Sequence, residues 1–465
     1  TMQIKNKLIL CLTAALAAMG FEASAQTSSI NAYSPYSMYG PGELSTPGNA
    51  AMRSMGGVGL GLRNTGQINT LNPAALSVAP SKSFLMDFGV DGTHFRNNQQ
   101  KYTADGAAAY KAKTAYNTVN FHNLSIAFPI ARGLGGAVSV APYSSVGYKV
   151  KNTEDNKDIW ADVGRVMYGY DGDGDITEVK LSIGWEVARN FSIGVAAKYY
   201  WGNIERNYSA TAVNIITGSG EVASTVGVDK YQVSNFKFQA GVQWNAILDN
   251  KRILTFGATY DLGGKLNPDK TSYVYTNNIF NQLHPFPVRD RIDAVELRLP
   301  HQAGIGVYYQ DRTIAWGVDY VYANWGGDNG SFAENATKGI RVAYSDTHTI
   351  KAGFAITPRM LDARNYLNRM TYRIGARVGN YYQTFAGQRI DCFAVTAGLG
   401  FPVRLWGSSS INLGFEFGCM RAPDSVAIDA RRIGLVNQKY YKLSLGFNLF
   451  SADTSDYWFV RQKYD

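Results

Sequence analysis

The feature that most restricts the fold of this chain is an alternation of apolar residues that recurs from residue 83 onward. The last repeat, residues 441–449, reads YKLSLGFNL, and residues 391–402 and 410–420 follow the same pattern. Successive side chains of a β-strand point to opposite faces of the sheet. Each repeat therefore has one apolar face and one small or polar face, and repeats of about ten residues are typical of transmembrane β-barrels.

The alternation predicts an all-β protein, a transmembrane antiparallel β-barrel of about fourteen strands, because single-chain bacterial barrels have even strand numbers. The expected strands are 84–95, 119–129, 134–148, 176–188, 191–206, 231–247, 252–262, 297–310, 313–324, 347–357, 371–380, 391–402, 410–420 and 440–450.

The connections between these strands alternate in length. Long segments (96–118, 149–175, 207–230, 263–296 and 325–346) alternate with short ones (130–133, 189–190, 248–251 and 311–312). Outer-membrane barrels have short periplasmic turns and long outer loops. Both ends of the barrel are therefore expected in the periplasm. Residues 358–370 are long for a periplasmic turn, and we expect a short helix there.

The first 25 residues have the pattern of a secretory signal peptide. Lys5 and Lys7 precede the apolar stretch 8–19, and Ala23-Ser24-Ala25 is a cleavage motif. Residues 26–82 then precede the first strand, residues 83–450 form the expected barrel, and residues 451–465 form a periplasmic C-terminal tail. Export and an apolar exterior predict an integral protein of the Gram-negative outer membrane, in contact with outer-membrane lipid.

Composition excludes several other classes of protein. Aromatic residues make up 13% and charged residues only 17% of the chain, whereas disordered chains are poor in aromatics and rich in charge. Three cysteines are too few for a disulfide scaffold. The net charge of +9 is scattered, without an aromatic-interleaved basic run, so we expect no nucleic-acid binding.

A soluble β-sandwich and a secreted β-helix are the alternatives, because their strands also alternate. A sandwich of this size usually divides into two domains joined by a linker. No Pro/Ser-rich linker follows residue 50, which favours the membrane barrel.

Several motifs resemble the FadL family, outer-membrane channels for long-chain fatty acids and other hydrophobic compounds. Residues 49–76 (NAAMRSMGGVGLGLRNTGQINTLNPAAL) resemble its N-terminal hatch, and residues 297–300 (LRLP), 304–307 (GIGV) and 315–325 (AWGVDYVYANW) resemble a strand entry and a Trp-containing strand of the family. Residues 255–266 (TFGATYDLGGKL) are similar to another of its strands, and residues 34–44 (SPYSMYGPGEL) resemble a Bacteroidetes branch.

The resemblance implies a hatch, formed by residues 26–82, that plugs the barrel lumen. The candidate hatch residues are Gly56, Gly57, Gly59, Asn72, Pro73 and Ala74. Glycine allows close backbone packing and Asn-Pro favours a turn. The alternative is an ordinary periplasmic extension that contains a turn.

The family also suggests a lateral opening at a kinked third strand, and the expected third strand contains Pro142. Proline donates no hydrogen bond to a β-ladder, so Pro142 predicts broken pairing. A simple bulge without a passage is the alternative interpretation.

Asp171, Asp173 and Asp175 have the alternate spacing of calcium ligands in a glycine-containing loop. Ile176 and Ser182 stand where an EF-hand has its glycine and its bidentate glutamate. A calcium site and a solvated acidic loop are therefore both open hypotheses, and we expect no other cofactor.

No set of residues predicts catalysis. The five histidines are scattered, and the nearest partners in sequence, His122 with Ser125 and His348 with Asp346, do not form a triad. Cys392 and Cys419 lie on neighbouring expected strands but on opposite faces, which predicts free thiols. We therefore expect that the protein is not an enzyme.

Two functions are compatible with the sequence. The first is a FadL-like channel for uptake or diffusion of a hydrophobic small-molecule ligand, such as a fatty acid or a detergent, through the lateral opening. The second is a structural or partner-binding barrel that serves as a subunit of an outer-membrane secretion or protein-assembly complex. An apolar pocket that reaches Pro142 favours the first, and a lumen filled by polar packing of residues 26–82 favours the second.

Overall fold

The structure of the protein is a computed structural model. It describes residues 32–79, 84–103, 106–153, 165–213, 222–249, 252–266, 269–278, 281–286, 297–326, 342–362, 364–403, 409–428 and 431–450. The expected signal peptide and C-terminal tail lie outside the described residues.

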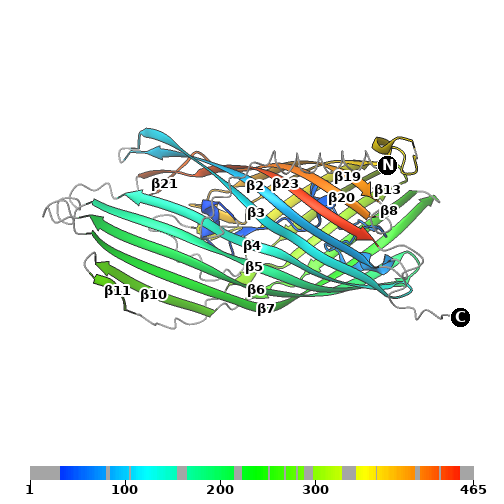
Figure 1. The fold of residues 1–465 in the computed structure, drawn as a ribbon, viewed down its shortest axis with the longest axis horizontal. Coiled ribbons are helices and arrows are strands. Elements are labelled where there is room, and N and C mark those ends of the chain that lie inside the picture. The colour runs from blue at the N-terminus through cyan, green and yellow to red at the C-terminus, as the bar shows by residue number, and fades with distance from the viewer. Residues whose placement is uncertain are drawn as a thin grey trace, which may run out of the picture.

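The fold is a closed antiparallel β-barrel of 14 strands, as predicted (Figure 1). The barrel strands are β2 (Leu85–Tyr102), β3 (Ala108–Ala131), β4 (Leu134–Thr153), β5 (Arg165–Ala188), β6 (Phe191–Val213), β7 (Val222–Asp249), β8 (Arg252–Asp261), β13 (Gln302–Gln310), β14 (Ile314–Ala323), β16 (Thr347–Ile356), β17 (Thr371–Asn380), β19 (Asp391–Val403), β20 (Ser409–Arg421) and β23 (Val436–Phe450).

The first and last barrel strands close the ring. β2 pairs with β3 on one side and with β23 on the other, where the register runs from Leu85 opposite Phe450 to Gln99 opposite Val436. Each of the other barrel strands pairs with its neighbours along the chain. At one end of the barrel, neighbouring strands such as β3 and β4 or β5 and β6 are joined by tight turns. This is the right-hand end in Figure 1.

The outer ends of several strands are longer than the sequence indicated. β3 begins at Ala108 instead of residue 119, and β5 begins at Arg165 instead of residue 176. Most of the expected loops 96–118 and 207–230 are therefore strand. These outer ends carry polar side chains on both faces, such as Lys111 and Thr114, both exposed, so they show no apolar alternation.

The barrel wall has the apolar exterior that a membrane protein requires. On β5, β6 and β7 the exposed side chains include Leu181, Trp185, Val195, Phe236 and Trp244. The intervening positions face the lumen, and Lys180, Ser182 and Gln243 are buried there (only 3% of the Lys180 surface is exposed). Lipid-facing and lumen-facing residues alternate in this way along a transmembrane strand.

The segment after β16 contains the predicted short helix, the 3₁₀ helix η4 (Tyr366–Arg369). Asn365 caps it, because its side chain accepts a hydrogen bond from the Leu367 amide. No helix among the described residues is long and apolar enough to cross a membrane.

Shorter elements lie inside the barrel or at its outer end. Inside are η1 (Pro35–Met38), β1 (Glu43–Leu44), the helix α2 (Ala50–Arg53) and η2 (Pro73–Val78). Toward the outer end, β10 (Asp269–Asn278) pairs with β7 and with β11 (Asn281–Phe286), which extends the sheet past the barrel (Figure 1). Three two-stranded sheets complete the fold: β9 (Gly264–Lys265) with β12 (Arg298–Leu299), β15 (Val342–Tyr344) with β18 (Gln383–Phe385), and β21 (Ser425–Ile428) with β22 (Arg431–Gly434).

Candidate functional site

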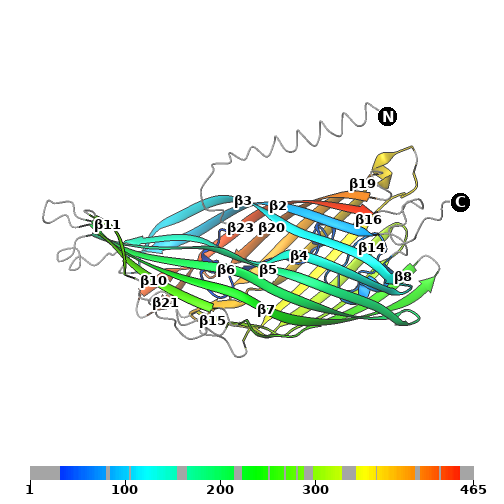
Figure 2. The ribbon, with the colours of Figure 1, turned by 60° about the horizontal axis from the view of Figure 1, so that its bottom comes forward.

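The described part of the N-terminal segment, residues 32–79, is called the plug below. It lies inside the ring of strands, shown in dark blue in Figures 1 and 2. Most of its residues are buried, including polar ones such as Ser34, Arg53 and Asn72. Its contacts with the inner face of the wall are the candidate functional site.

The predicted turn Asn72-Pro73-Ala74 packs against glycines of the wall. Asn72 caps η2, because its side chain accepts a hydrogen bond from the Ala74 amide, and its side-chain amide donates to Val242 on β7. A Cβ added to Gly184 would lie 2.3 Å from the Pro73 carbonyl oxygen, and one added to Gly194 would lie 2.3 Å from the Ala74 nitrogen. The bare backbone of β5 and β6 therefore lets this turn approach the wall closely.

The predicted glycines at positions 56, 57 and 59 contact the opposite side of the wall. Gly56 adopts φ +73°, which favours glycine, and its amide donates to the Thr396 hydroxyl at 2.9 Å. The amides of Gly59 and Leu60 donate to the same carboxylate oxygen of Asp319 on β14, at 2.7 and 3.0 Å. The Asp319 side chain thus fixes the plug backbone to the middle of the sheet.

A buried group of charged side chains joins α2 to β2 and β3. The Arg53 guanidinium lies 2.6 Å from the Asp91 carboxylate, and His122 Nδ1 lies 3.1 Å from the same oxygen. His122 also contacts Arg53, and its Nε2 lies 2.7 Å from the Gly48 carbonyl oxygen. At most 8% of any of the three side chains is exposed, so the group is shielded from water.

Two further cations connect the plug to the wall near residues 63–70. The Lys180 ammonium on β5 donates to the Thr70 carbonyl at 2.5 Å and to the Gln239 side chain. The Arg63 guanidinium of the plug donates to the Ser192 hydroxyl at 2.8 Å and forms an ion pair of 3.3 Å with Glu186. Polar contacts with the plug therefore extend from the middle of the wall to the turn between β5 and β6.

The wall has a seam between β3 and β4. Their pairing runs from Ala131 opposite Leu134 only to Leu124 opposite Val140. Beyond this point the outer half of β3, residues 108–123, pairs with β2 alone, and the outer half of β4, residues 141–153, pairs with β5 on its other side. The seam thus separates two strands that are neighbours in the sequence.

The plug occupies the edge that β4 exposes at this seam. Glu43 and Leu44 of β1 pair with Ser145 and Ser144 of β4, and the Ser45 amide donates to the Tyr143 carbonyl at 2.8 Å. Nearer the outer end, the Ser34 amide donates to the Gly147 carbonyl at 2.9 Å. Between Tyr143 and Gly147, backbone groups of β4 that lack a partner on β3 thus find partners on the plug.

Ser37 and Gly147 make two further contacts at this edge. The Ser37 hydroxyl donates to the Gly147 carbonyl at 3.1 Å, and the Gly147 amide lies 3.0 Å from the Ser37 hydroxyl oxygen. The Gly42 carbonyl accepts a hydrogen bond of 2.5 Å from the Tyr382 hydroxyl on the opposite wall. The plug therefore bridges the seam and the far side of the lumen.

Pro142 lies where the seam begins. Its register with β5 shifts between Pro142 and Ser144, which is a bulge, and the last β3–β4 pair is at Val140. The Tyr143 ring packs edge-on against Tyr200, with 4.9 Å between ring centroids. The lateral opening itself remains a proposal, because in this structure the plug lies across the seam.

The three candidate calcium ligands lie on a strand instead of a loop. Asp171, Asp173 and Asp175 belong to β5 and pair with Asn207, Glu205 and Asn203 of β6. Alternate residues of a strand are about 6.6 Å apart along its axis, so the carboxylates are spread along one face. Among the described residues, no group of three His, Cys, Asp or Glu side chains lies close enough together to hold a metal ion.

The other sequence candidates do not form a catalytic set. His122 contacts Asp91 and Arg53 as described, and the His348 ring lies 2.7 Å from the Tyr320 hydroxyl. Cys392 and Cys419 are both free, as predicted. They belong to adjacent rungs of the β19–β20 ladder, where Cys392 faces Met420 and Phe393 faces Cys419, so their side chains point to opposite faces.

Sequence reasoning missed the wall residues Asp319 and Asp91, which hold the plug, and the plug residue Ser37, which contacts the wall. A weak signal existed for the two aspartates, since a carboxylate on the lumen face of a strand requires a buried partner. Asp319 occupies such a position in the segment AWGVDYVYA. The partners of Asp319 are backbone amides, which no sequence pattern identifies.

Comparison with solved structures shows the fold. The chain is similar to a Pseudomonas aeruginosa FadL homologue, with 13% identity over 87% of this chain and 99% of the other, and a TM-score of 0.56. It is also similar to the monoaromatic hydrocarbon channel CymD, with 12% identity over 89% of this chain and 98% of the other, and a TM-score of 0.52. The chain is similar as well to the Pseudomonas putida toluene transporter TodX, with 13% identity over 88% of this chain and 98% of the other, and a TM-score of 0.50.

Fold, apolar exterior and plugged lumen together define an integral outer-membrane β-barrel protein of the FadL-like type. No curated protein matches the sequence. A family model named BamG matches residues 4–465, nearly the whole chain. The chain therefore belongs to the BamG family.

Proposed function

We propose that this protein is a structural, partner-binding barrel, a subunit of a complex in the outer membrane of a Gram-negative cell. The observation that carries the proposal is the polar packing of residues 32–79, which fill the lumen and bridge the seam. Membership of the BamG family leaves room for this role. The three solved structures named above are 12 or 13% identical and support only the fold.

The energetics of the plug favour a static role. Movement that opened the seam would separate the Ser34 and Ser45 amides from β4, and movement that opened the lumen would also separate Arg53 from Asp91. Removing one partner of a buried ion pair costs about 3 to 5 kcal/mol, and a buried polar group without a partner costs about 1 to 3 kcal/mol. Repeated opening would have to overcome several such costs together.

The outer part of the barrel offers a surface for partners. A transmembrane β-strand needs about 9 to 11 residues, whereas β5, β6 and β7 have 24, 23 and 28 residues. More than half of each strand therefore extends beyond the membrane. This broad sheet, continued by β10 and β11 at the left in Figure 1, offers a partner a large surface outside the hydrocarbon core.

The second candidate function is a channel for a hydrophobic small molecule, such as a fatty acid or an aromatic hydrocarbon. The interrupted β3–β4 pairing at Pro142 favours it, because a lateral exit lets an apolar solute remain in contact with hydrocarbon. Each CH₂ kept from water gains about 0.8 kcal/mol. This function requires the plug to leave the edge of β4.

A disulfide between plug and wall separates the two functions. Leu44 and Ser144 are directly opposite in the β1–β4 pair, and opposite residues in antiparallel pairs have Cα atoms about 4.5 to 5.5 Å apart, within the range of disulfides. The experiment uses Leu44→Cys with Ser144→Cys, in a background that also carries Cys392→Ser and Cys419→Ser. The single variant Leu44→Cys in the same background is the matched control.

For a structural subunit, the oxidised double variant supports growth and retains its co-purifying outer-membrane proteins as well as the control does. For a channel, uptake of labelled fatty acid or toluene by cells is lost in the oxidised double variant and restored by a reductant. Uptake that is lost on oxidation while complex formation is unchanged would contradict the structural role as the sole function.

A further inference from the structure

The outer face of the wall around β2 and β23 changes character abruptly along the strands. Rungs of this ladder pair Phe88 with Phe447, Val90 with Leu445, Gly92 with Leu443 and His94 with Tyr441. Phe88 and Tyr441 are exposed, whereas intervening residues such as Asp91 and Thr93 are buried, so these rungs face the lipid. With the pair of Met86 and Leu449 below Phe88, the band runs from Met86 to His94, nine residues, close to the length that crosses the hydrocarbon core.

A pair of cations follows directly above this band. Two residues beyond His94, on the same face of the sheet, Arg96 pairs with Lys439. Both side chains are exposed. The aromatic rung below them is formed by the His94 and Tyr441 rings, 6.3 Å apart, with Phe417 5.2 Å from Tyr441. Two residues of strand separate the rungs by about 6.6 Å, which places Arg96 and Lys439 at the level of the lipid headgroups.

Three more cations extend the positive surface on the neighbouring strands. Lys113 and Lys111 of β3 pair with Asn98 and Gln100 of β2. Arg421 lies on β20, two residues beyond Cys419, which pairs with Lys439. All three side chains are exposed. We call the surface formed by Arg96, Lys111, Lys113, Arg421 and Lys439 the basic groove.

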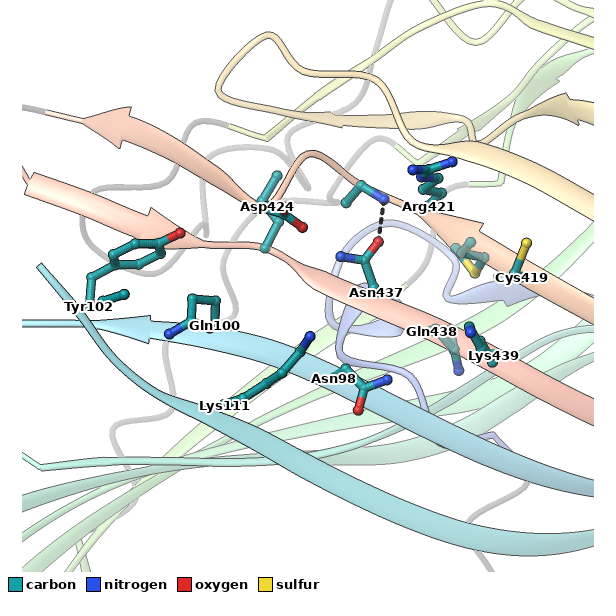
Figure 3. A pocket seen from close by; sticks show the side chains of 14 residues that line it. Asn98, Gln100, Tyr102, Lys111, Cys419, Arg421, Asp424, Asn437, Gln438 and Lys439 are labelled. Atoms are coloured by element: carbon teal, nitrogen blue, oxygen red, sulfur yellow. Dashed lines mark hydrogen bonds between the residues drawn. The ribbon is translucent and has the colours of Figure 1, made fainter. Parts of the chain in front are cut away.

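The basic groove is a real depression. Two adjoining hollows of about 610 and 520 Å³ share Asn98, Lys111 and Lys439 in their lining. Figure 3 shows the larger one, where Lys111 and Lys439 come from strands on either side of the strand that carries Asn98, and Asn437 lies near Lys439. The Asn437 side-chain oxygen accepts a hydrogen bond from the Ala422 amide, and its amide nitrogen provides a further donor beside the cations.

The positive charges of the basic groove have no ion-pair partner among the described residues, because no carboxylate of this part of the chain lies within ion-pair distance of any of the five cations. Of the described residues that line the two hollows, Asp424 is the one that is acidic. Asp391 is opposite Arg421 across the β19–β20 ladder and is exposed. Like charges in one groove repel, so an anion there is favourable.

We infer that the basic groove binds the phosphorylated headgroup of a glycolipid in the outer leaflet of the outer membrane. Charge complementarity selects the phosphate, and the position of the cations one rung above the aromatic band selects a ligand anchored in the membrane. Lysine and arginine at a membrane surface attract anionic lipids in this way. This inference is independent of the proposed function.

The wall below the basic groove suits the acyl chains of such a lipid. On β3, Val119 and Phe121 point outward and are 64% and 40% exposed, and Phe415 and Phe417 lie on β20 beneath Arg421. One lipid molecule can therefore place its phosphate among the cations and its chains along these side chains. A soluble anion gains only the first of these two contacts.

The test compares two double variants in lipid nanodiscs. Arg96→Gln with Lys439→Gln removes the first cationic rung, and Lys149→Gln with Lys151→Gln removes two exposed lysines on β4, outside the basic groove. The probe is purified bisphosphorylated lipid A at low mole fraction in neutral phospholipid, with the dephosphorylated lipid as the second arm. Lipid bound to each barrel is counted by native mass spectrometry, and folding is checked by heat-dependent gel mobility.

We expect the wild-type barrel and the β4 variant to retain the phosphorylated lipid, and the Arg96/Lys439 variant to bind it about tenfold more weakly, since each basic residue near the surface contributes to binding. The dephosphorylated lipid should not distinguish the variants. Inorganic phosphate at millimolar concentration should not displace the lipid from wild-type protein.

Equal retention by all variants would overturn the inference, and so would equal binding of both lipids to the wild-type barrel, a result that needs no variant. If the Arg96/Lys439 variant kept its lipid but lost a co-purifying acidic protein, the basic groove would be a protein-binding surface and the inference would be wrong.

Discussion

Asp319 and Gly59 are joined by a hydrogen bond of 2.7 Å between the wall carboxylate and the plug backbone amide. The same carboxylate oxygen accepts a second hydrogen bond from the Leu60 amide, and Asp319 is only 1% exposed. A single side chain in the middle of β14 therefore holds two consecutive amides of a segment that lies 259 residues away in the sequence.

Replacement of Asp319 should loosen the plug and leave the barrel intact. Hydrogen bonds to a charged group contribute about 1.5 to 3 kcal/mol each, so loss of both in Asp319→Ala should weaken docking by about 3 to 6 kcal/mol. Hydrogen exchange at Gly59 and Leu60 reports the effect. Asp319→Asn keeps one acceptor and should show an intermediate rate, and protection equal to wild type in Asp319→Ala would mean that these bonds do not hold the plug.

The Arg53–Asp91 ion pair should be strongly coupled. Asp91→Ala leaves a buried guanidinium beside His122, and loss of one partner of a buried pair costs about 3 to 5 kcal/mol. Removing both partners should cost less than the sum of the two single changes, with a coupling above about 1 kcal/mol.

A double-mutant cycle by urea unfolding in detergent measures this coupling, with Arg53→Ala, Asp91→Ala and the combined variant. Additive single effects would show that the two groups do not depend on each other, despite the 2.6 Å separation.

Two glycines of β5 should differ sharply in their tolerance of alanine. In Gly184→Ala the new methyl would lie 2.3 Å from the Pro73 carbonyl oxygen, a rigid backbone atom. In Gly169→Ala it would lie 2.5 Å from the Ser209 hydroxyl, which can rotate away. We therefore expect Gly184→Ala to displace the plug and expose it to protease, and Gly169→Ala to behave as wild type.

Limited proteolysis in nanodiscs, with cleavage sites mapped by mass spectrometry, makes the comparison. Cleavage between residues 60 and 79 in Gly184→Ala alone is the expected result. Equal resistance of both variants would contradict the close approach of the plug to β5 and β6.

The ionised form of Asp362 should stabilise the segment between β16 and β17. Its carboxylate accepts hydrogen bonds from the Asn368 side chain at 2.6 Å and from the Asn365 and Arg364 amides at 3.0 and 2.9 Å. These bonds, the Asn368 one foremost, lower the pKa of Asp362. A lowered pKa means that the contribution is present above the ordinary aspartate pKa and is lost as the pH falls through the lowered value.

Carboxyl ¹³C shifts of labelled aspartate should show Asp362 titrating below the ordinary range, and Asn368→Ala should move its midpoint upward. An unchanged midpoint in Asn368→Ala would show that the side-chain bond does not influence the pKa of Asp362.

The sequence allowed the membrane part of the fold to be predicted closely, because the lipid imposes a period of two on every strand. β17 has the predicted bounds, β8 and β16 each end one residue earlier than predicted, and β14 is one residue shorter at each end. The outer ends of β3 and β5 were missed, since above the membrane neither face is apolar and hydrogen bonds between backbones form the sheet regardless of side chain.

The candidate site was predictable only in part. Asn72 and Pro73 predict a turn, and Pro142 predicts a break in strand pairing, because both effects depend on the residue's own backbone preferences. The partners of the plug are non-local: Ser37 contacts Gly147 and Gly59 contacts Asp319 across 110 and 260 residues of sequence. The identity of a small polar residue in the plug does not indicate which backbone group of the wall it contacts.

The contacts of the plug with β23 couple its docking to closure of the barrel. The plug precedes the first barrel strand, yet the Tyr36 hydroxyl donates to Val436 and the Ser34 hydroxyl donates to Gln438, both on the final strand. These two hydrogen bonds exist only when the last barrel strand has taken its place beside β2. The two ends of the described chain therefore reach their final arrangement together, and a fault in either one disturbs the other.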